Sequence, residues 1–507
     1  MVNLEELFNE CILKAREELN SINLEEVHSL GISKKSADLL GSHTVVTYPP
    51  LDALQKSSIA IEEINFSKEV DLYVHIPFCE YPCKFCPYTT LNNFGEDSKK
   101  IPEYFFALKK EILIWSKKLK LTNSKIHSLY IGGGTPFSIQ TEILKDLLKF
   151  LKSNFDFIDL PEICIETSPR AILKDDGLDK LQMLLNNDIT RISIGIQSFD
   201  LATLKDTART FTGHKQGDEE KAVQILLSSG LKNLNIDMIQ DLPVPFGINV
   251  FERLKNDLFA ISRLKPQHIT WYNLRLRPET TYALQGVNII SEEESLLSRL
   301  IIWNFLGTIG YEILEGDRFV LSKKFEDNFR KTRGSVDTDL LGIGVSSYSH
   351  TKNMFFQNCR TTGSNVRADS RIAIVDYINR VSQGNDAITL SLLLSQNERL
   401  CGKFALGLKK GVNLHELQKE FQTVPGLYSC ENILFNVLNF VDAGLLEFCN
   451  GVLKFTRKGM LWENEICEKF YSSYAVSLAK EKRKTVNSVL KTTNIISSVQ
   501  AKKFVLI

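Results

Sequence analysis

The sequence has 507 residues, of which 43% are hydrophobic and 24% charged, so it can bury a large core and divide into two or three domains. Its 61 basic residues balance its 61 acidic ones, giving a formal net charge of zero. This balance argues against broad nucleic-acid or anionic-membrane binding, because both depend on an excess of Lys and Arg. The N-terminus lacks a secretory signal and no apolar run approaches the ~18 residues of a membrane span. We therefore expect a soluble cytoplasmic protein with no nucleic-acid or membrane partner.

The N-terminal segment, residues 1–70, has a mostly helical pattern. It ends in "VVTYPPLDAL", whose paired prolines indicate a turn or an extended link. We predict that residues 1–70 form a helical extension and linker.

Six short apolar runs follow, each continued by a longer amphipathic stretch such as "YFFALKKEILIWSKKLK" or "ILKDLLKFLKSNF". Buried parallel strands are rich in apolar residues, and the crossovers between them need a dozen or more residues. We therefore predict an α/β fold with a partial parallel (β/α)6 barrel over residues 71–385; an open doubly wound sheet is the rival. The six runs are "LYVHIP" from Leu72, "SLYIGGG" from Ser128, "ICIETSP" from Ile163, "RISIGIQS" from Arg191, "NLNIDMI" from Asn233 and "HITWYNLRL" from His268.

Polar or glycine residues collect where these strands end. In parallel barrels the carboxyl ends of the strands carry the chemistry, so residues at five such ends should converge on one site. The residues concerned are Cys79, Gly132–Gly134, Glu166, Gln197 and Asp237.

The character of the chain changes after about residue 385. Two helical patterns, a short hairpin and a closing helix predict a small winged-helix-like α+β domain over residues 386–475. No basic patch accompanies it, which disfavours nucleic-acid binding. The lysine-rich, weakly patterned stretch 476–507 is expected to be a tail, in part disordered.

Three cysteines, Cys79, Cys83 and Cys86, lie within the segment "YVHIPFCEYPCKFCPY" in a C-x3-C-x2-C spacing. Thiolates this close together bind soft metals, and three of them can hold three corners of an iron–sulfur cubane. Structural zinc would need a fourth ligand, and the only nearby candidate, His75, lies inside the strand pattern and should point elsewhere. The spacing favours an iron–sulfur cluster over zinc. The other seven cysteines are scattered and are expected to be buried thiols: Cys11, Cys164, Cys359, Cys401, Cys430, Cys449 and Cys467.

A glycine run in "YIGGGTP" follows the second predicted strand. Such a run lets backbone groups approach a ligand closely, although a tight turn would also explain it. It lacks the lysine and hydroxyl of a P-loop and the spacing of a dinucleotide fingerprint.

Five segments resemble, in order and spacing, the radical S-adenosylmethionine (SAM) enzymes, and within them the oxygen-independent coproporphyrinogen III oxidase-like family. The resemblance runs from about residue 48 to 475. It implies that Cys79, Cys83 and Cys86 hold a [4Fe–4S] cluster whose fourth iron is chelated by SAM. One-electron reduction would then release a 5′-deoxyadenosyl radical that abstracts hydrogen from a substrate. The segments are "YVHIPFCEYPCKFC", "GGGTP", "IETSPR", "RISIGIQSFD" and "NIDMIQDLP".

The resemblance also implies roles for individual residues. Tyr73 would lie near the SAM sulfonium, which makes it the candidate catalytic side chain, and Phe85 would line the adenine pocket. Gly133, Gly134 and Thr135 would form the backbone cradle for the amino group of SAM. The remaining polar SAM contacts would be Glu166, Gln197, Arg209 and Asp237.

Two departures bear on the reaction. Coproporphyrinogen decarboxylases carry a fourth cysteine where this chain has Tyr88, and the heme-chaperone branch carries a His-Asn/Tyr-Trp element that is absent here. The pattern resembles more closely the class C radical SAM methyltransferases and cyclopropanases, in which a second SAM donates a methyl or methylene group to an unsaturated carbon. A porphyrin oxidase and a heme chaperone are the alternatives. The expected partners are an unsaturated natural product or a tetrapyrrole and an electron donor such as flavodoxin or ferredoxin.

Overall fold

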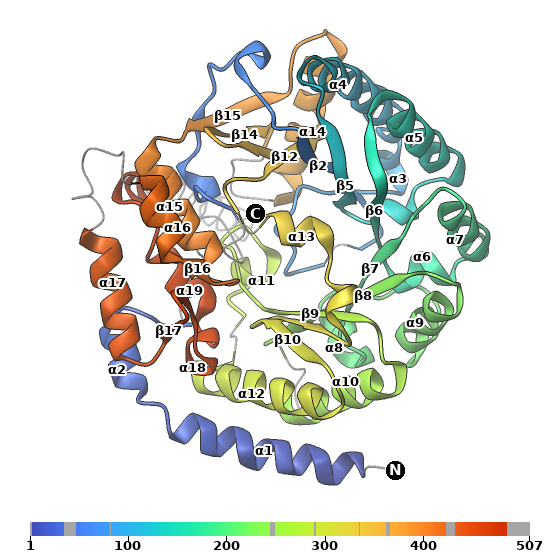
Figure 1. The fold of residues 1–507 in the computed structure, drawn as a ribbon. Helices are drawn as coiled ribbons and strands as arrows, with labels where there is room; N and C mark the ends of the chain where they lie inside the picture. Colours follow the sequence, from blue (N-terminus) through green and yellow to red (C-terminus); the bar gives the residue numbers. More distant parts are fainter. Residues whose placement is uncertain are drawn as a thin grey trace, which may run out of the picture.

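The computed structural model describes residues 3–34, 47–81, 83–243, 249–287, 290–333, 335–360, 366–421 and 431–483. Six parallel strands form the centre of the fold and coincide with the six predicted runs. They lie side by side in the order in which they occur along the chain (Figure 1). A doubly wound sheet would reverse its strand order at a switch point, so the sequential order identifies the predicted partial barrel. The strands are β2 (Glu69–Ile76), β5 (Lys125–Gly133), β6 (Phe157–Thr167), β7 (Arg191–Gln197), β8 (Asn233–Gln240) and β9 (His268–Asn273).

Helices connect these strands on the outside of the barrel (Figure 1). The longer helices bury apolar side chains; α5, for example, buries Leu144, Leu147, Leu148 and Leu151 on one face. Local signals set their ends: Ser168 caps α6 ahead of Pro169, and Ser291 and Glu294 form a capping box at α12. These helices are α4 (Ile101–Thr122), α5 (Thr141–Asn154), α6 (Pro169–Leu173), α7 (Gly177–Leu185), α8 (Leu201–Asp206), α9 (Asp218–Ser228), α10 (Val250–Leu264) and α12 (Glu292–Thr308).

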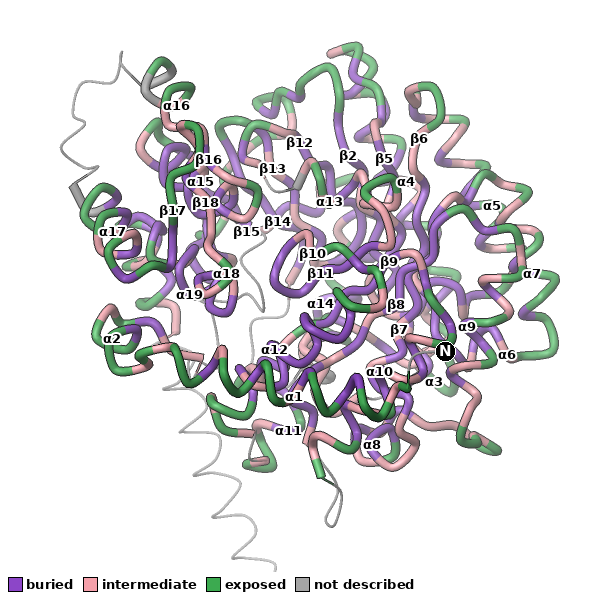
Figure 2. The backbone as a smooth tube through the Cα atoms, turned by 60° about the horizontal axis from the view of Figure 1, so that its bottom comes forward, coloured by how far each residue is buried: buried purple, intermediate pink, exposed green. Residues whose placement is uncertain are grey.

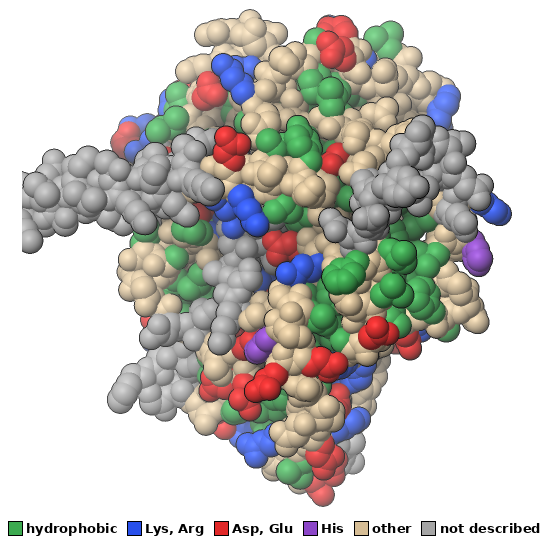
Figure 3. Space-filling view, turned by 90° about the vertical axis from the view of Figure 1, so that its left-hand side faces the viewer, with side chains coloured by type: hydrophobic (Ala, Val, Ile, Leu, Met, Phe, Trp, Pro, Cys, Tyr) green, Lys and Arg blue, Asp and Glu red, His purple; other side chains and the backbone are tan. Residues whose placement is uncertain are grey.

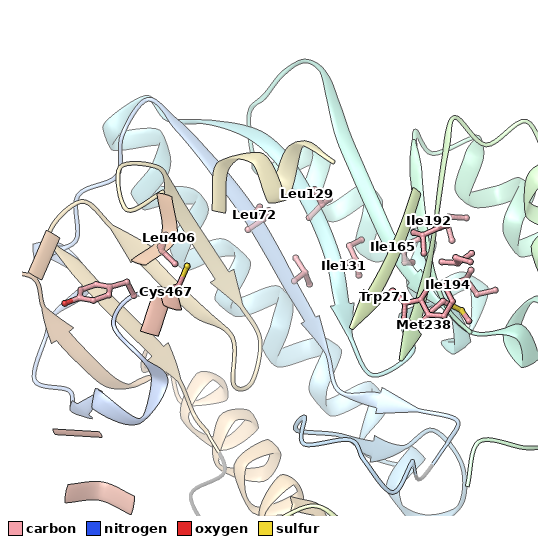
Figure 4. Close-up of a cluster of buried hydrophobic side chains, with 14 of the residues drawn as sticks. Leu72, Leu129, Ile131, Ile165, Ile192, Ile194, Met238, Trp271, Leu406 and Cys467 are labelled. Atoms are coloured by element: carbon pink, nitrogen blue, oxygen red, sulfur yellow. The ribbon is translucent and has the colours of Figure 1, made fainter. Parts of the chain in front are cut away.

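The outward face of the six strands is apolar and packs under the helices. Figure 4 shows Leu72, Leu129, Ile165, Ile192 and Trp271 from neighbouring strands in this layer, and all five are buried. In Figure 2 the central strands are drawn mainly as buried chain, whereas exposed residues lie on the surrounding helices and turns. Because strand side chains alternate between faces, the inward positions remain available for other residue types.

The sheet extends beyond the six strands on both sides. On the β2 side, β12 (Asp339–Ile343) pairs with β2 in parallel, with Gly342 opposite Tyr73, and antiparallel strands follow. On the β9 side, β11 (Arg318–Val320) and β10 (Glu312–Glu315) add an antiparallel edge. The strands beyond β12 are β13 (Tyr348–Thr351), β14 (Met354–Asn358), β15 (Ile388–Leu393) and β1 (Gln55–Lys56).

The N-terminal extension is only partly helical. Helix α1 (Leu4–Asn20) packs along α12, and α2 (Leu24–Ser29) follows it (Figure 1). The segment from residue 47 to 68 is mostly irregular and contributes β1 to the edge of the main sheet. The predicted boundary at residue 70 therefore falls within one continuous packing unit.

The C-terminal part has the predicted winged-helix-like arrangement, in which helices precede a small antiparallel sheet. Helix α17 exposes Leu434, Phe435 and Leu438, and hydrophobic side chains gather on this side of the molecule (Figure 3). The elements are α15 (Gln396–Gly407), β16 (Val412–Asn413), α16 (Leu414–Phe421), α17 (Glu431–Asp442), β17 (Leu446–Cys449), β18 (Val452–Phe455), α18 (Arg457–Met460) and α19 (Glu463–Glu468).

Two elements cross the predicted domain bounds in this half of the chain. Strand β15 lies past residue 385 yet belongs to the main sheet, and the predicted tail begins inside a helix over residues 473–483. The rest of that tail, from residue 484, lies outside the described residues. Domain bounds at 70, 385 and 475 remain predictions.

Most of the scattered cysteines that the structure describes are buried, as expected. Cys449 is exposed instead, because it ends an edge strand of the small sheet; Cys430 lies outside the described residues. Among the described helices none combines the length and the apolar character needed to cross a bilayer.

Candidate active site

The inward face of the barrel is polar and borders one large cavity. Inward side chains come from alternate strand positions: Tyr73 and His75 on β2, for example, and Asn235 and Asp237 on β8. The cavity measures about 640 Å³, within the range of small-molecule sites. All twelve predicted site residues line it: Tyr73, Cys79, Cys83, Phe85, Cys86, Gly133, Gly134, Thr135, Glu166, Gln197, Arg209 and Asp237.

The three cysteines lie on a loop that begins with the short strand β3 (Phe78–Cys79). The Cys79 thiol lies 3.3 Å from the Thr135 hydroxyl, and the Arg209 guanidinium donates to the Cys83 sulfur at 3.6 Å. Burial, together with the neighbouring Cys83, raises the pKa of both Cys79 and Cys86. Deprotonating these thiols therefore requires positive charge nearby, from Arg209 or from a bound metal.

Buried protein contacts anchor this loop. The Glu80 carboxylate, 2% exposed, accepts a hydrogen bond from the Ser168 hydroxyl at 2.7 Å and pairs with Lys174 at 2.7 Å. Farther along, the Lys84 N–H donates to the Thr207 carbonyl at 3.1 Å. The loop is thus tied to the chain segments that follow β6 and β7.

The glycine run at the end of β5 packs against the backbone that immediately precedes the cysteine loop. The Gly134 N–H donates to the Ile76 carbonyl at 2.9 Å, and the Thr135 N–H donates to the Phe78 carbonyl at 2.8 Å. A Cβ on Gly134 would lie 2.3 Å from the Phe78 carbonyl oxygen, so only glycine permits this approach. Since these N–H groups are engaged, the run can offer a ligand carbonyl oxygens, which suit an ammonium group.

Glu166 at the end of β6 fixes the glycine run from the other side. Its carboxylate accepts hydrogen bonds from the Gly133 N–H and the Tyr130 hydroxyl, both at 2.9 Å. Tyr130 stacks on Phe329 with ring centroids 5.0 Å apart, and the Tyr73 ring centroid lies 6.1 Å from that of Tyr130. An aromatic wall therefore stands beside a carboxylate on the inward face.

His75 is occupied by protein contacts, as expected. Its Nε2–H donates to the Thr89 carbonyl at 3.2 Å, which leaves Nδ1 to accept from the Tyr73 hydroxyl at 3.0 Å. Burial lowers the pKa of His75 to about 4, so the ring is neutral at physiological pH. Both nitrogens are used, and His75 is therefore not a free fourth ligand.

Strand β7 ends in a left-handed residue: Gln197 has φ +70°, a conformation that non-glycine residues seldom adopt. Arg209 donates to the Gly195 carbonyl and lies over the Tyr81 ring at 4.9 Å. A Cβ on Gly195 would meet both the Arg209 guanidinium and the Gln197 amide. Backbone strain of this kind is typical of ligand sites.

Asp237 on β8 is a partly buried carboxylate that lines the cavity. It accepts hydrogen bonds from the Ser193 hydroxyl at 2.8 Å and the Asn235 amide at 2.9 Å. Burial raises the pKa of Asp237, and these hydrogen bonds oppose the shift. Asp327, which also lines the cavity, pairs with Arg318 at 2.5 Å and Arg191 at 3.5 Å.

Comparison with known proteins relates this arrangement to a family. Residues 73–243 match the sequence profile of the Radical SAM superfamily. The chain is 33% identical over 218 residues to the heme chaperone HemW of Haemophilus influenzae, covering 42% of this chain and 53% of that protein. It is 26% identical over 405 residues to HemW of Lactococcus lactis, which covers 78% of this chain and 96% of the relative.

Two further matches concern an oxidase from Escherichia coli. The chain is 26% identical over 419 residues to its oxygen-independent coproporphyrinogen III oxidase, covering 79% of this chain and 85% of the oxidase. The solved structure of that oxidase, HemN, superposes with a TM-score of 0.70 at 22% identity, covering 85% of this chain and 97% of HemN. Residues 73–243 form a radical SAM domain, and the chain is similar to HemN and HemW well beyond it.

A radical SAM domain implies a [4Fe–4S] cluster and SAM as cofactors. The cysteine loop of this radical SAM protein fits a cluster better than a single ion. Among the described residues, three candidate ligand atoms come within 4.8 Å of one another only at Glu315, Asp317 and Glu463, and not at the cysteines. Thiolates on one zinc at ~2.3 Å would lie about 3.8 Å apart, whereas cubane corners are spread wider.

Several cavity residues of the radical SAM site were not predicted from the sequence. Tyr130 and Asn235 stand two residues from the glycine run and from Asp237, and Ser193 stands four residues from Gln197, so strand periodicity could have indicated them. No local pattern connects the basic residues that line the cavity from distant segments. These are Arg275, Arg277, Arg360, Lys482 and Arg483.

Proposed function

We propose that this protein is a radical SAM enzyme that acts on a tetrapyrrole, in the manner of the coproporphyrinogen oxidases. One observation carries the proposal: sequence similarity to proteins named for porphyrin and heme extends well beyond the radical SAM core, over 85% of the oxidase and 96% of the Lactococcus chaperone. A large part of the chain outside residues 73–243 therefore also belongs to the related region. The chemistry would be that of an oxidoreductase.

We assign separate sets of residues to the cluster and to SAM. Cys79, Cys83 and Cys86 would hold the cluster, and Arg209 would offset the negative charge of their thiolates. The cluster, when bound and reduced, would supply the electron for reductive cleavage of SAM, and thereby the hydrogen-abstracting chemistry of this superfamily. We further propose these SAM contacts: Tyr73, Phe85, Gly133, Gly134, Thr135, Glu166, Gln197, Arg209 and Asp237.

Position in the cavity and fixed geometry support these assignments. The Asp237 and Glu166 carboxylates both line the cavity, and hydrogen bonds from the protein hold each of them in one orientation. Such carboxylates would orient the hydroxyl or amino groups of SAM and exclude competing water. Tyr73, between His75 and Tyr130, would give the ligand a rigid aromatic surface.

Heme carriage is the second candidate. It is supported by the 33% identity to the Haemophilus HemW and by Tyr88, which stands where the decarboxylases carry a fourth cysteine. Tyr88 is 56% exposed beside the cavity, where it could meet a flat ligand.

Methyl or methylene transfer from a second SAM, the interpretation that the sequence departures favoured, gains no support from these relatives and ranks third. The reductant, whether flavodoxin or ferredoxin, and a cytoplasmic location remain predictions.

An anaerobic assay separates the three candidates. Reconstituted protein is given SAM and dithionite with coproporphyrinogen III, with heme and with alkenyl compounds, and 5′-deoxyadenosine, S-adenosylhomocysteine and porphyrin products are quantified by mass spectrometry. Tetrapyrrole-dependent 5′-deoxyadenosine with a decarboxylated or oxidised porphyrin supports the proposal. Stoichiometric heme binding without turnover supports heme carriage, and S-adenosylhomocysteine in amounts equal to 5′-deoxyadenosine supports transfer. The Cys83→Ala variant is the control for cluster-independent products.

A further inference from the structure

The cavity carries a group of basic side chains that the cysteine loop and the proposed SAM contacts leave unused. We call Arg277, Arg360, Lys482 and Arg483 the cation group. They come from three segments far apart in the chain: the stretch after β9, the end of β14 and the helix over residues 473–483. The fold thus assembles four positive charges on one cavity wall.

Two carboxylates pair with members of the cation group. Asp52 lies 3.4 Å from Arg360 and 3.0 Å from Arg483, and Glu279 lies 2.8 Å from Arg277. Burial raises the pKa of Asp52, but Arg360, Arg277 and Arg483 together hold it below its usual value. These ion pairs hold the three guanidinium groups in place on the cavity wall beside Lys482.

Within the cation group, Lys482 lacks a hydrogen-bond partner for its ammonium group in the described part of the chain. Its ammonium nitrogen is buried and has no hydrogen-bond acceptor among the described residues. Burial and the neighbouring Arg360 lower the pKa of Lys482 to about 8, so it is still mostly protonated at neutral pH. A buried ammonium without an acceptor is costly, unless an anionic ligand supplies the missing partner.

The cation group lies close to the cysteine loop. Thr89, three residues after Cys86, lies within 2.7 Å of the Ser346 hydroxyl, and the Ser346 N–H donates to the Cys359 carbonyl at 2.7 Å. Arg360 is the next residue. A ligand extending from the proposed SAM site would therefore reach these cations within the same cavity.

We propose that the cation group binds the carboxylate groups of a tetrapyrrole substrate, with Lys482 as a specificity-determining contact; this inference rests on the proposed function. Side-chain carboxylates of a porphyrin would pair with Lys482 and with the guanidinium groups, while the ring lies toward the cysteine loop. The carboxylate of a second SAM shares this chemistry and is the alternative occupant.

The test measures ligand binding to the anaerobic, cluster-loaded protein in the presence of SAM. The probes are coproporphyrin III, which has four carboxylates, and deuteroporphyrin dimethyl ester, which has none free. Lys482→Met should raise the Kd for coproporphyrin III about tenfold or more and leave the Kd for the ester unchanged. Lys482→Arg should retain the affinity. Lys480→Met, an exposed lysine on the same helix, is the matched control, and thermal unfolding verifies that each variant is folded.

The outcomes separate the inference from the function on which it rests. Equal Kd values for coproporphyrin III in wild type and Lys482→Met overturn the carboxylate site and leave the tetrapyrrole function standing. If neither porphyrin binds to the wild type, both are overturned. Loss of one SAM equivalent in equilibrium dialysis, with porphyrin affinity unchanged, assigns the cation group to SAM and refutes it as a substrate site.

Discussion

Gly133 offers the sharpest test of the site geometry, because two independent features require glycine there. Its φ of +120° lies in a region that L side chains rarely adopt, and a Cβ would lie 2.7 Å from the His75 ring. The backbone strain of Gly133→Ala should cost ~1–3 kcal/mol. The contact with His75, whose ring is fixed by two hydrogen bonds, should add ~1–3 kcal/mol of overpacking.

Gly230 provides a matched control. It has φ +84°, and an added Cβ would meet nothing within 4 Å, so Gly230→Ala carries the backbone cost alone. We expect Gly133→Ala to be the more destabilising by ~1–3 kcal/mol. Urea unfolding of both variants gives the comparison, with the midpoints converted through a common m-value.

A double substitution isolates the steric contact. In a His75→Ala background the imidazole ring is absent, so Gly133→Ala should lose most of its additional cost. In the double-mutant cycle the two substitutions together should therefore destabilise the protein by less than the sum of their separate costs. If Gly133→Ala costs no more than Gly230→Ala, or if the coupling is zero, the packing of His75 against the glycine run is refuted.

Three further predictions concern the cysteines, Asp237 and His75. Replacing Cys79, Cys83 or Cys86 by Ala should abolish the brown absorbance of the reconstituted cluster and all SAM cleavage; a full four-iron content in any of these variants would contradict the assignment. Asp237→Ala should retain the cluster absorbance but weaken SAM binding about tenfold or more in equilibrium dialysis, and unchanged affinity would remove Asp237 from the SAM site. The folded protein keeps His75 neutral down to a pKa of about 4, whereas an unfolded histidine titrates near ~6.5. The contribution of His75 to the free energy of unfolding is therefore fully present above pH ~6.5 and should fall by ~2 kcal/mol between pH 7 and 5. A urea-midpoint profile of wild type against His75→Ala measures this contribution, and parallel profiles would count against it.

Sequence patterns predicted the six central strands because each is a local apolar run followed by a helix. They also predicted the meeting of Cys79, Glu166 and Asp237, since the carboxyl ends of consecutive parallel strands lie at one edge. These are consequences of order along the chain and need no knowledge of distant contacts.

The parts that escaped prediction depend on long-range packing. Strand β12 joins β2 from more than 250 residues away, and its short "DLLGI" run has no feature that selects this neighbour. Lys482 and Asp52 likewise approach one another only once the helix over residues 473–483 has docked. The cation group was therefore invisible in the sequence, where its members are four basic residues with no shared motif.

The anchoring of the cysteine loop also bears on the order in which the working protein is assembled. Glu80 and Lys84 tie the loop to neighbouring segments by contacts that do not involve the cysteine sulfurs. Small zinc domains, by contrast, gain most of their folding free energy from the metal itself. Here the polypeptide has its own means of shaping the loop, so maturation would follow folding: iron and sulfide would enter a loop already held in place, and losing them would leave a folded protein able to be loaded again.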